Sequence, residues 1–340
     1  ILAGDVGGTN TRFQLYEISR LAPTMLKQNE NKRYMNEDYP TFNAVLQSFL
    51  DESKIHKPPA TMCLAVAGPV ADNKVQFTNR ESWSIDGEIM SHLFGIRFVR
   101  LVNDFVANGY GLLCLDESSE CEVLQAAPKV SDAPIACIGA GTGLGECYLT
   151  SNGNNHYQCY PSEGGHAEFA PRSELEFDLL RFLKKKFKQN NRVSVERVIS
   201  GTGLANVYEF LCEKFPAKIN KEVHAKVYPL LHIVAPQIQA AGDMKGAVIA
   251  TSQPMCGLCA HTMQIFAEAY GAEAGVAGLK WLPYGGLYLT GGLTPKNLNL
   301  LIGENSHFMK AFRDKGRVSG MLHKVPIFAV KSDNLGERGA

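Results

Sequence analysis

The residues of this sequence that could do chemistry are short polar side chains placed directly after apolar, strand-like runs. Asn103 and Asp104 follow such a run at 98–102 and lead into the helix-like stretch 105–113. Ligands of open α/β sheets bind outside the carboxyl ends of the strands. We therefore expect the pair to hold a hydroxyl-bearing ligand, with the Asp104 carboxylate accepting the proton of the reacting hydroxyl. The ordinary alternative is that Asp104 is only a helix N-cap.

A second polar cluster, Glu163-Gly164-Gly165-His166, has two glycines between its chemical groups. Glycine lets the backbone turn tightly, so the Glu163 carboxylate and the His166 imidazole can converge on one small ligand. A carboxylate accepts hydrogen bonds from sugar hydroxyls, and an imidazole can donate or accept them. Glu196 is a candidate third carboxylate, although composition alone favours a surface or ion-paired residue there.

Two glycine-rich turns are each set between strand-like runs, the first at residues 5–12 and the second at residues 139–145. Glycine supplies positive φ in a hairpin and lets the backbone approach a ligand closely. Successive backbone N–H groups in such a turn form a concave anion site. Two turns from separate stretches of chain could hold one polyphosphate from both sides, in a cleft between domains. The candidate nucleotide-binding residues are Asp5, Gly7, Gly8, Thr9 and Asn10 in the first turn, and Gly141, Thr142 and Gly143 in the second.

Other nucleotide motifs are excluded by the residues around the glycines. No Gly-Lys-Ser/Thr follows four free positions after a glycine, so there is no Walker A loop. The second turn leads into a strand-like run and does not open a helix, which excludes a dinucleotide-binding turn. Gly291 and Gly292 follow the strand-like run 287–290 and would leave a flat backbone surface for an adenine or a ribose.

Strand-like and helix-like stretches alternate along the chain, which predicts an α/β fold. Both halves share one motif order, namely strand, glycine hairpin, strand and then helices, which suggests an ancient duplication. The predicted strands are 1–3, 13–15, 62–67, 98–102, 135–138, 147–150, 287–290 and 326–330, and the predicted helices are 41–53, 105–113, 174–187 and 255–270, with several more between 203 and 281.

The bulk composition is that of a globular protein without a charge-driven partner. The 340 residues include 34 Lys+Arg and 34 Asp+Glu, so no net field attracts nucleic acid or an anionic membrane. No apolar stretch approaches the roughly 20 residues of a spanning helix. Asp5 and Arg12 interrupt the start, so we expect neither a membrane partner nor a signal peptide. The nine scattered cysteines predict free thiols in a reducing compartment, with Cys256 and Cys259 as buried small side chains rather than a zinc site.

Taken together, these motifs resemble those of the bacterial-type glucokinases, a family of the hexokinase-like, actin-like ATPase superfamily. The resemblance runs from Gly4 to nearly the end of the chain. Each motif alone is weakly specific, but their joint order is strong. The matching segments are 5–12 and 139–145 (phosphate motifs), 64–70 (connecting strand and Gly-Pro turn), 103–104 (sugar and catalytic base), 163–166 (sugar motif), 287–293 (adenosine motif), 270–275 and 312–317.

The resemblance implies a two-domain, ribonuclease H-like α/β fold with a central cleft, its small domain formed by residues 1–114 plus about 318–340 and its larger one by about 115–317. It implies transfer of the ATP γ-phosphoryl group to the 6-hydroxyl of glucose, with Mg²⁺ held by Asp5 through water. It further implies a homodimer, a role in glycolysis and a cytoplasmic location, with an organelle left open. By resemblance, the base is Asp104, the glucose ligands are Asn103, Asp104, Glu163, His166 and Glu196, and the ATP ligands are the two turns with Gly291 and Gly292.

Three rival interpretations come from related folds. Another hexose or N-acetylhexosamine kinase would use the same residues, and a panel of sugars decides between them. The related repressor and kinase family normally has a cysteine-rich zinc site after its sugar motif, whereas residues 167–171 after His166 contain no cysteine. A sugar-sensing repressor would also need a DNA-binding helix-turn-helix before the first turn. A filament-forming actin-like ATPase would have no use for Glu163 and His166 together.

Overall fold

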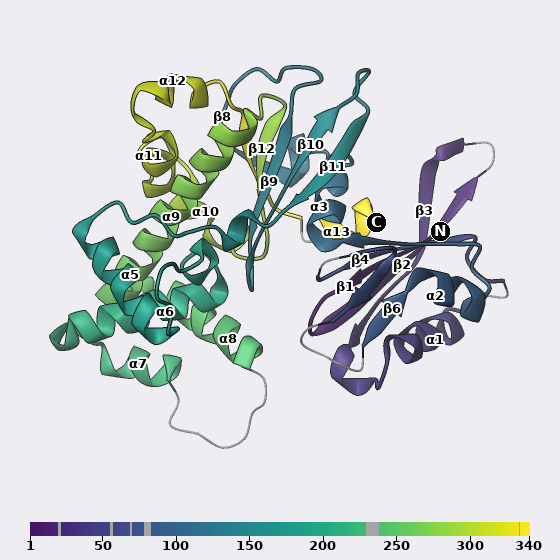
Figure 1. Ribbon diagram of the computed structural model, residues 1–340, viewed down its shortest axis with the longest axis horizontal. Coiled ribbons are helices and arrows are strands. Elements are labelled where there is room, and N and C mark those ends of the chain that lie inside the picture. The colour runs from purple at the N-terminus through teal and green to yellow at the C-terminus, as the bar shows by residue number, and fades with distance from the viewer. Residues whose placement is uncertain (20–21, 55–56, 69, 78–82, 229–237, 333) are drawn as a thin grey trace. The chain divides into compact units, whose positions relative to one another are not determined.

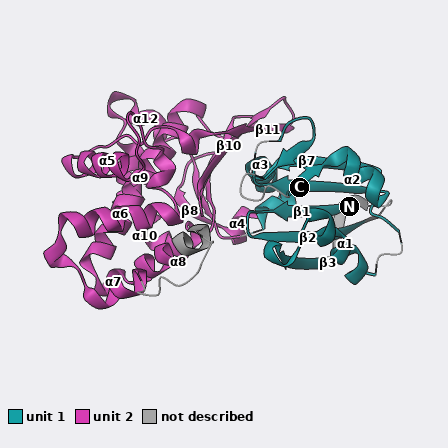
Figure 2. Cartoon of the chain, turned by 60° about the horizontal axis from the view of Figure 1, so that its bottom comes forward, with its two compact units in different colours: residues 1–115, 334–340 teal, residues 116–333 magenta. Residues whose placement is uncertain are grey.

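The computed structural model describes residues 1–19, 22–54, 57–68, 70–77, 83–228, 238–332 and 334–340. The chain divides into two compact units, called unit 1 (residues 1–115 and 334–340) and unit 2 (residues 116–333) and coloured separately in Figure 2. The first boundary differs by one residue from the expected one. The chain returns to unit 1 at 334 rather than at about 318, because β13 (Ile327–Val330) pairs with β12 (Gly286–Thr290) inside the sheet of unit 2.

Unit 1 is built on a five-stranded sheet with the order β3-β2-β1-β4-β7. The central strand β1 pairs antiparallel with β2 and parallel with β4, and β7 continues the parallel half. A separate two-stranded sheet pairs β5 with β6. The strands of unit 1 are β1 (Leu2–Val6), β2 (Asn10–Ser19), β3 (Ala22–Met35), β4 (Thr61–Val66), β5 (Lys74–Gln76), β6 (Ser84–Asp86) and β7 (Phe98–Asn103).

Helices cover both faces of the sheet of unit 1, with α1 and α2 on one face and α3 and α13 on the other (Figure 1). The Thr41 hydroxyl caps α1 by accepting from Ala44 N, and the helix buries Phe42 and Phe49 against Phe13 of β2. This packing fixes one face of β2, so Arg12 lies on the opposite face, toward α13. The helices of unit 1 are α1 (Phe42–Glu52), α2 (Gly87–Phe94), α3 (Asp104–Leu112) and α13 (Leu335–Gly339), with the 3₁₀ helix η1 (Asn36–Asp38).

Unit 2 is built on a six-stranded sheet with the order β11-β10-β9-β12-β13-β8. Its first five strands repeat both the order and the directions of the sheet of unit 1. The shared motif order of the two halves is therefore a shared topology. The strands not yet given are β8 (Cys121–Gln125), β9 (Ile135–Ala140), β10 (Leu144–Ser151) and β11 (Tyr157–Ser162).

The long helix α9 is buried along most of its length and contacts β9 and the helices α6, α8, α10, α11 and α12 of unit 2. The α helices are α4 (Glu117–Glu120), α5 (Glu174–Lys186), α6 (Gly201–Lys214), α7 (Lys221–Val227), α8 (Ile238–Thr251), α9 (Gly257–Trp281), α10 (Leu298–Leu301), α11 (His307–Arg313) and α12 (Ser319–Leu322). The 3₁₀ helices are η2 (Gly164–His166), η3 (Val195–Arg197), η4 (Pro216–Lys218), η5 (Gln253–Met255), η6 (Pro295–Asn297) and η7 (Gly316–Val318).

The predicted strands and helices are present within a few residues of their expected bounds, except that the helix predicted at 255–270 continues to Trp281 as α9. The Gly-Pro turn expected after β4 includes Pro69, which lies outside the described residues. All nine cysteines are free, and Cys256 and Cys259 are buried as predicted. Among the described residues, no helix is long and apolar enough to cross a membrane.

Candidate functional site

The first glycine turn joins β1 to β2 as an antiparallel hairpin, as predicted. Gly7 N donates to Asn10 O at 2.9 Å and closes the turn. Gly8 and Thr9 are exposed at its tip. A Cβ atom built on Gly8 would meet nothing within 4 Å, so a ligand can approach the backbone there.

Asn36 holds this turn in shape, a role that sequence reasoning missed. Its side chain is 1% exposed, its Nδ2 donates to Gly7 O at 2.8 Å, and its Oδ1 accepts from the Thr11 hydroxyl at 2.9 Å. Its backbone N donates to Thr9 O at 2.9 Å. Asn36 reaches the first turn because it directly follows the long strand β3, which pairs with β2. The sequence spacing between Asn36 and the turn gives no sign of this contact.

Asn103 and Asp104 lie where β7 ends and α3 begins, as predicted. Asn103 Oδ1 accepts from the backbone N of Phe105 at 2.9 Å and of Val106 at 3.3 Å, so Asn103 is the N-cap. Asp104 is the first residue of the helix and is half-buried. Asn103 rather than Asp104 is therefore the N-cap, although Asp104 Oδ1 also accepts from Phe105 N at 2.9 Å.

Asp5, on β1, faces the C-terminal helix α13. A Cβ atom built on Gly336 would lie 3.6 Å from Asp5 Cγ. Burial, together with the nearby carboxylates of Glu337 and Asp104, raises the pKa of Asp5 to about 7, and the Arg12 guanidinium opposes this rise. A group that binds here and carries positive charge would relieve this accumulation of acidic side chains.

Glu337 and Arg12 form an ion pair at 3.3 Å that links α13 to β2. Glu337 is 2% exposed, and its Oε2 has no hydrogen-bond partner among the described residues. Sequence reasoning missed Glu337, since an acidic residue near a chain end carries no signal of burial. Arg12 belongs to the first glycine-rich motif, but the sequence does not indicate that its ion-pair partner is Glu337.

The second glycine turn joins β9 to β10 as an antiparallel hairpin, again as predicted. Gly141 N donates to Gly143 O at 2.8 Å, and Gly201 N donates to Gly141 O at 2.8 Å. Gly201 is the first residue of the 14-residue helix α6, so the positive end of that helix dipole lies against the turn. Thr142 is exposed at the tip. The turn and the helix end together favour an anion.

Glu196 supports this turn and is not the surface or ion-paired residue that composition favoured. Its Oε2 accepts from Leu144 N at 3.0 Å, and a Cβ atom built on Gly143 would lie 2.5 Å from the same oxygen. Glycine is therefore needed at 143 for the carboxylate to reach the turn. The carboxylate was predicted to touch a sugar, and the structure adds its contact with the second turn.

The sugar motif places Glu163 and His166 side by side at the end of β11. Glu163 Oε2 lies 3.7 Å from His166 Nε2, and both side chains are exposed. Their glycines rest on β10: a Cβ atom on Gly165 would lie 1.9 Å from Leu144 O. A Cβ atom on Gly164 would lie 1.9 Å from Glu146 Oε2. The predicted convergence of Glu163 and His166 on one small volume is therefore present.

A short antiparallel pairing joins the sugar motif to Glu196. Phe169 N donates to Val193 O and Val195 N donates to Ala167 O, both at 2.8 Å. Residues 167–169 directly follow His166. Residues 193–195 lead into η3, which carries Glu196. These backbone bonds, together with the contact between the Glu196 side chain and Leu144 N, bring the sugar motif, the third carboxylate and the second glycine turn together within unit 2.

Gly291 and Gly292 follow β12 and lie beside the second turn. Gly291 has φ of +81°, and a Cβ atom on it would lie 2.4 Å from Ala140 O. A Cβ atom on Gly292 would meet nothing within 4 Å. Glycine is thus required at 291 because of its positive φ and its close contact with the backbone of Ala140. Gly292 leaves the open surface expected for a nucleoside.

The expected site residues fall into two sets, one in each unit. Unit 1 carries Asp5, Gly7, Gly8, Thr9, Asn10, Asn103 and Asp104, and unit 2 carries Gly141, Thr142, Gly143, Glu163, His166, Glu196, Gly291 and Gly292. Within each unit the structure brings the expected residues together. The roles that the resemblance gives them stay predictions.

Comparisons with known proteins point to one family over the whole chain. A family model described as glucokinase matches residues 2–340. A curated glucokinase from Trichormus variabilis is 43% identical over 342 aligned residues, covering 100% of this chain and 97% of that protein. A curated glucokinase from Escherichia coli is 31% identical, covering 100% of this chain and 95% of that protein.

A solved structure supports the same assignment. The glucokinase from an Antarctic psychrotroph is 28% identical, has a TM-score of 0.77 and covers 99% of this chain and 96% of its own. The fold is therefore the two-domain actin-like ATPase fold that the motifs predicted. The chain belongs to the glucokinase family, whose members are ATP-dependent kinases that phosphorylate glucose.

Proposed function

We propose that this glucokinase transfers the γ-phosphoryl group of ATP to the 6-hydroxyl of glucose with the Asp104 carboxylate as general base. The observation that carries the proposal is the position of Asp104, the first residue of α3 directly after β7, where Asn103 is the N-cap. A carboxylate there accepts the hydroxyl proton as the oxygen attacks phosphorus, and the oxygen–γ-phosphorus bond forms as the bond to ADP breaks.

The two glycine turns are proposed to hold the phosphates of one ATP. Each turn offers an exposed threonine, Thr9 or Thr142, beside backbone N–H groups. The N-terminal end of α6 adds positive potential beside the second turn. Phosphoryl transfer needs alignment and neutralisation of charge more than covalent chemistry, and these groups provide both.

Asp5 is proposed to bind Mg²⁺ through water. The described residues contain no cluster of three or more histidine, cysteine or acidic side chains that could hold a metal directly. A single carboxylate surrounded by the charges of Glu337 and Asp104 suits Mg²⁺, which usually retains several waters and takes the rest of its ligands from phosphates. The ion, when bound, neutralises charge that develops on the phosphate oxygens.

Glucose is proposed to bind Asn103 and Asp104 from unit 1 and Glu163, His166 and Glu196 from unit 2. A solved glucokinase from Balamuthia mandrillaris, 20% identical with a TM-score of 0.77, has glucose bound. Specificity would come from paired polar groups, since a sugar that lacks a matched hydroxyl leaves a carboxylate or imidazole unpaired, costing about 1–3 kcal/mol per group. Mannose and other epimers should therefore have lower catalytic efficiency than glucose.

The test is ADP release by the purified protein with a panel of hexoses and N-acetylhexosamines, with and without Mg²⁺. We expect glucose to give the highest kcat/KM, and removal of Mg²⁺ to abolish turnover. Equal efficiency on glucose and mannose would contradict the proposed sugar contacts. Higher efficiency on an N-acetylhexosamine would favour the alternative kinase, and sugar-independent turnover would favour an ATPase.

We further propose a homodimer, a cytoplasmic location and a role in glycolysis. These proposals rest on the family alone, and the mass of the protein in solution tests the first of them. The chain has no net formal charge at pH 7, which gives no electrostatic reason to expect nucleic acid as a partner.

A further inference from the structure

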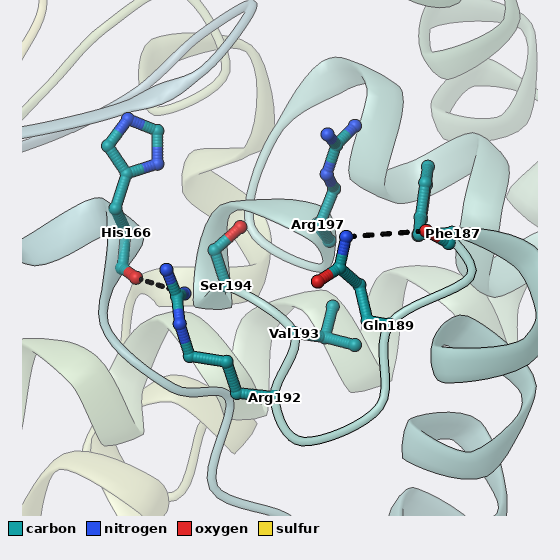
Figure 3. Close-up of a pocket in the computed structure, with 7 residues that line it drawn as sticks. All are labelled: His166, Phe187, Gln189, Arg192, Val193, Ser194 and Arg197. Atoms are coloured by element: carbon teal, nitrogen blue, oxygen red, sulfur yellow. Dashed lines mark hydrogen bonds between the residues drawn. The ribbon is translucent and has the colours of Figure 1, made fainter.

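A pocket of about 180 Å³ lies in unit 2 beside the sugar motif, and cationic side chains line it. Arg192 and Arg197 supply two guanidinium groups, and Gln189, Ser194 and His166 add polar groups (Figure 3). Of the proposed sugar ligands in unit 2, His166 lines the pocket, whereas Glu163 and Glu196 do not. The pocket is therefore adjacent to the proposed sugar site and shares His166 with it.

Arg197 supplies the pocket with a guanidinium that has no ion-pair partner in the part of the chain that the structure describes. Among the described residues, no carboxylate lies within ion-pair distance of its guanidinium. The guanidinium instead stacks on the Phe187 ring, 4.2 Å from the ring centroid. Stacking holds the planar fork in one orientation and leaves its N–H edge for an acceptor. An arginine held in this way is typical of a site for an anion.

Arg192 connects the pocket to the sugar motif. Its Nη1 donates to the carbonyl oxygen of His166 at 2.8 Å, a bond drawn in Figure 3. Its only carboxylate neighbour among the described residues is the exposed Glu168, 3.9 Å from Nε. A weak ion pair of this kind in solvent contributes little. The guanidinium can therefore turn to a stronger acceptor.

We propose that this pocket binds a phosphate group, either inorganic phosphate or the phosphate of a small monoester. Two arginines match the oxygens of a phosphate in a bidentate manner. The pocket is smaller than the roughly 300 Å³ at which sites for drug-sized ligands begin. A phosphate group fits that size, whereas a whole nucleotide does not.

Occupation of the pocket weakens binding at the sugar motif. A hydrogen bond from arginine to a phosphate is stronger than one to a neutral carbonyl. Phosphate therefore draws the Arg192 guanidinium from His166 O and releases the segment that carries the His166 imidazole. This step rests on the proposed role of His166 in glucose binding, whereas the phosphate site itself does not.

The test is calorimetric titration of inorganic phosphate into the wild-type protein and the Arg197→Gln variant, without sugar. We expect the variant to bind phosphate at least about tenfold more weakly, the loss typical of a charged hydrogen bond. Arg197→Lys, which keeps the charge but not the fork, should lose less. The wild type and both variants keep the glycine turns, so phosphate that binds there contributes equally to each titration. A difference in phosphate affinity between the wild type and a variant therefore measures binding in the pocket.

Arg181→Gln is the matched control, because Arg181 is exposed in the same unit and pairs with Asp178 at 2.7 Å. It should bind phosphate as the wild type does. A second series with glucose 6-phosphate separates the sources: a loss in Arg197→Gln for this ester alone would assign the pocket to phosphate monoesters. No loss in either series, or an equal loss in Arg181→Gln, would overturn the site.

The coupling is measured as the dissociation constant of glucose with and without saturating phosphate. We expect phosphate to raise it at least about fivefold in the wild type, and not in Arg197→Gln. By linkage, glucose must weaken phosphate binding by the same factor. If phosphate binds but the dissociation constant of glucose does not rise, the link through Arg192 is overturned while the phosphate site stands. The titration without sugar does not depend on the kinase assignment, so failure of that assignment would leave its result unchanged.

Discussion

At the scale of single residues, Asp5 shows how neighbours set the protonation of a group that is proposed to act as a carboxylate. Burial, Glu337 and Asp104 raise its pKa to about 7, against the influence of Arg12. Below that pH the carboxyl is neutral, and it would no longer attract Mg²⁺. The ionised form accumulates as the pH rises through about 7.

We therefore expect kcat/KM for MgATP to rise with pH through about 7, since this parameter reports the ionisation of the free enzyme. Glu337→Gln removes one negative neighbour and frees Arg12, so both effects lower the pKa of Asp5. The acid limb of the pH profile should then move to lower pH. Glu17→Gln, an exposed change in β2, should leave the limb in place. A profile unchanged by Glu337→Gln would contradict this account of Asp5.

Glu146 is a second acidic residue with an unusual environment, beneath the glycines of the sugar motif. It is 2% exposed, and its Oε1 has no hydrogen-bond partner among the described residues. Burial and the nearby Glu273 carboxylate raise its pKa to about 8, and Lys280 opposes this rise. The neutral form is therefore the one that the folded protein favours.

Folding stability should fall as the pH rises from about 4.5 to about 8, because the unfolded chain loses this proton before the folded chain does. Glu146→Gln removes that ionisation. Urea denaturation gives the free energy of unfolding at pH 5.5 and at pH 8. We expect the decrease between these two pH values to be at least about 1.4 kcal/mol smaller for Glu146→Gln than for the wild type. The control is Glu213→Gln, an exposed change in α6. Parallel pH dependences of wild type and Glu146→Gln would refute the buried neutral carboxyl.

At the scale of elements, the sugar motif depends on close contact between η2 and β10. A Cβ atom on Gly165 would lie 1.9 Å from Leu144 O, a backbone atom that cannot rotate away. Gly165→Ala should push η2 off the strand and raise the KM for glucose about tenfold or more. Gly320→Ala is the matched control, since a Cβ atom there would meet nothing within 4 Å. A normal KM in Gly165→Ala would show that the motif tolerates displacement.

The glycine hairpins could be predicted from sequence because their turns and flanking strands are local signals. The strand β3 could not, because the segment 22–35 is polar and forms the edge of its sheet. Asn36, Glu337 and the hydrogen bond that Leu144 N donates to Glu196 could not be predicted for a related reason. Each depends on a partner far away in sequence, and no periodicity records such a contact.

At the scale of the whole molecule, two units with the same strand order each carry part of the expected machinery. The return of the chain at 334 was misplaced at about 318, because the strand β13 completes the second sheet before α13 joins unit 1. Hydrophobic patterning predicts that such a strand exists but does not predict the sheet in which it pairs.

If both units serve one sugar site, then a change in either should affect the same binding event. We expect calorimetry to give one glucose per chain for the wild type. Asn103→Ala in unit 1 and Glu163→Gln in unit 2 should each weaken that binding by about tenfold or more. A second, unaffected class of glucose sites in either variant would show that the two sets of residues act separately.

The central claim is that Asp104 accepts the proton of the glucose 6-hydroxyl during phosphoryl transfer. Asp104→Asn keeps the shape of the side chain and removes its basicity. The direct measurement is the turnover number of this variant for glucose 6-phosphate formation, together with its glucose dissociation constant. We predict a turnover lowered by a factor of about 10² to 10⁴ with glucose still bound. Turnover close to that of the wild type would contradict the account.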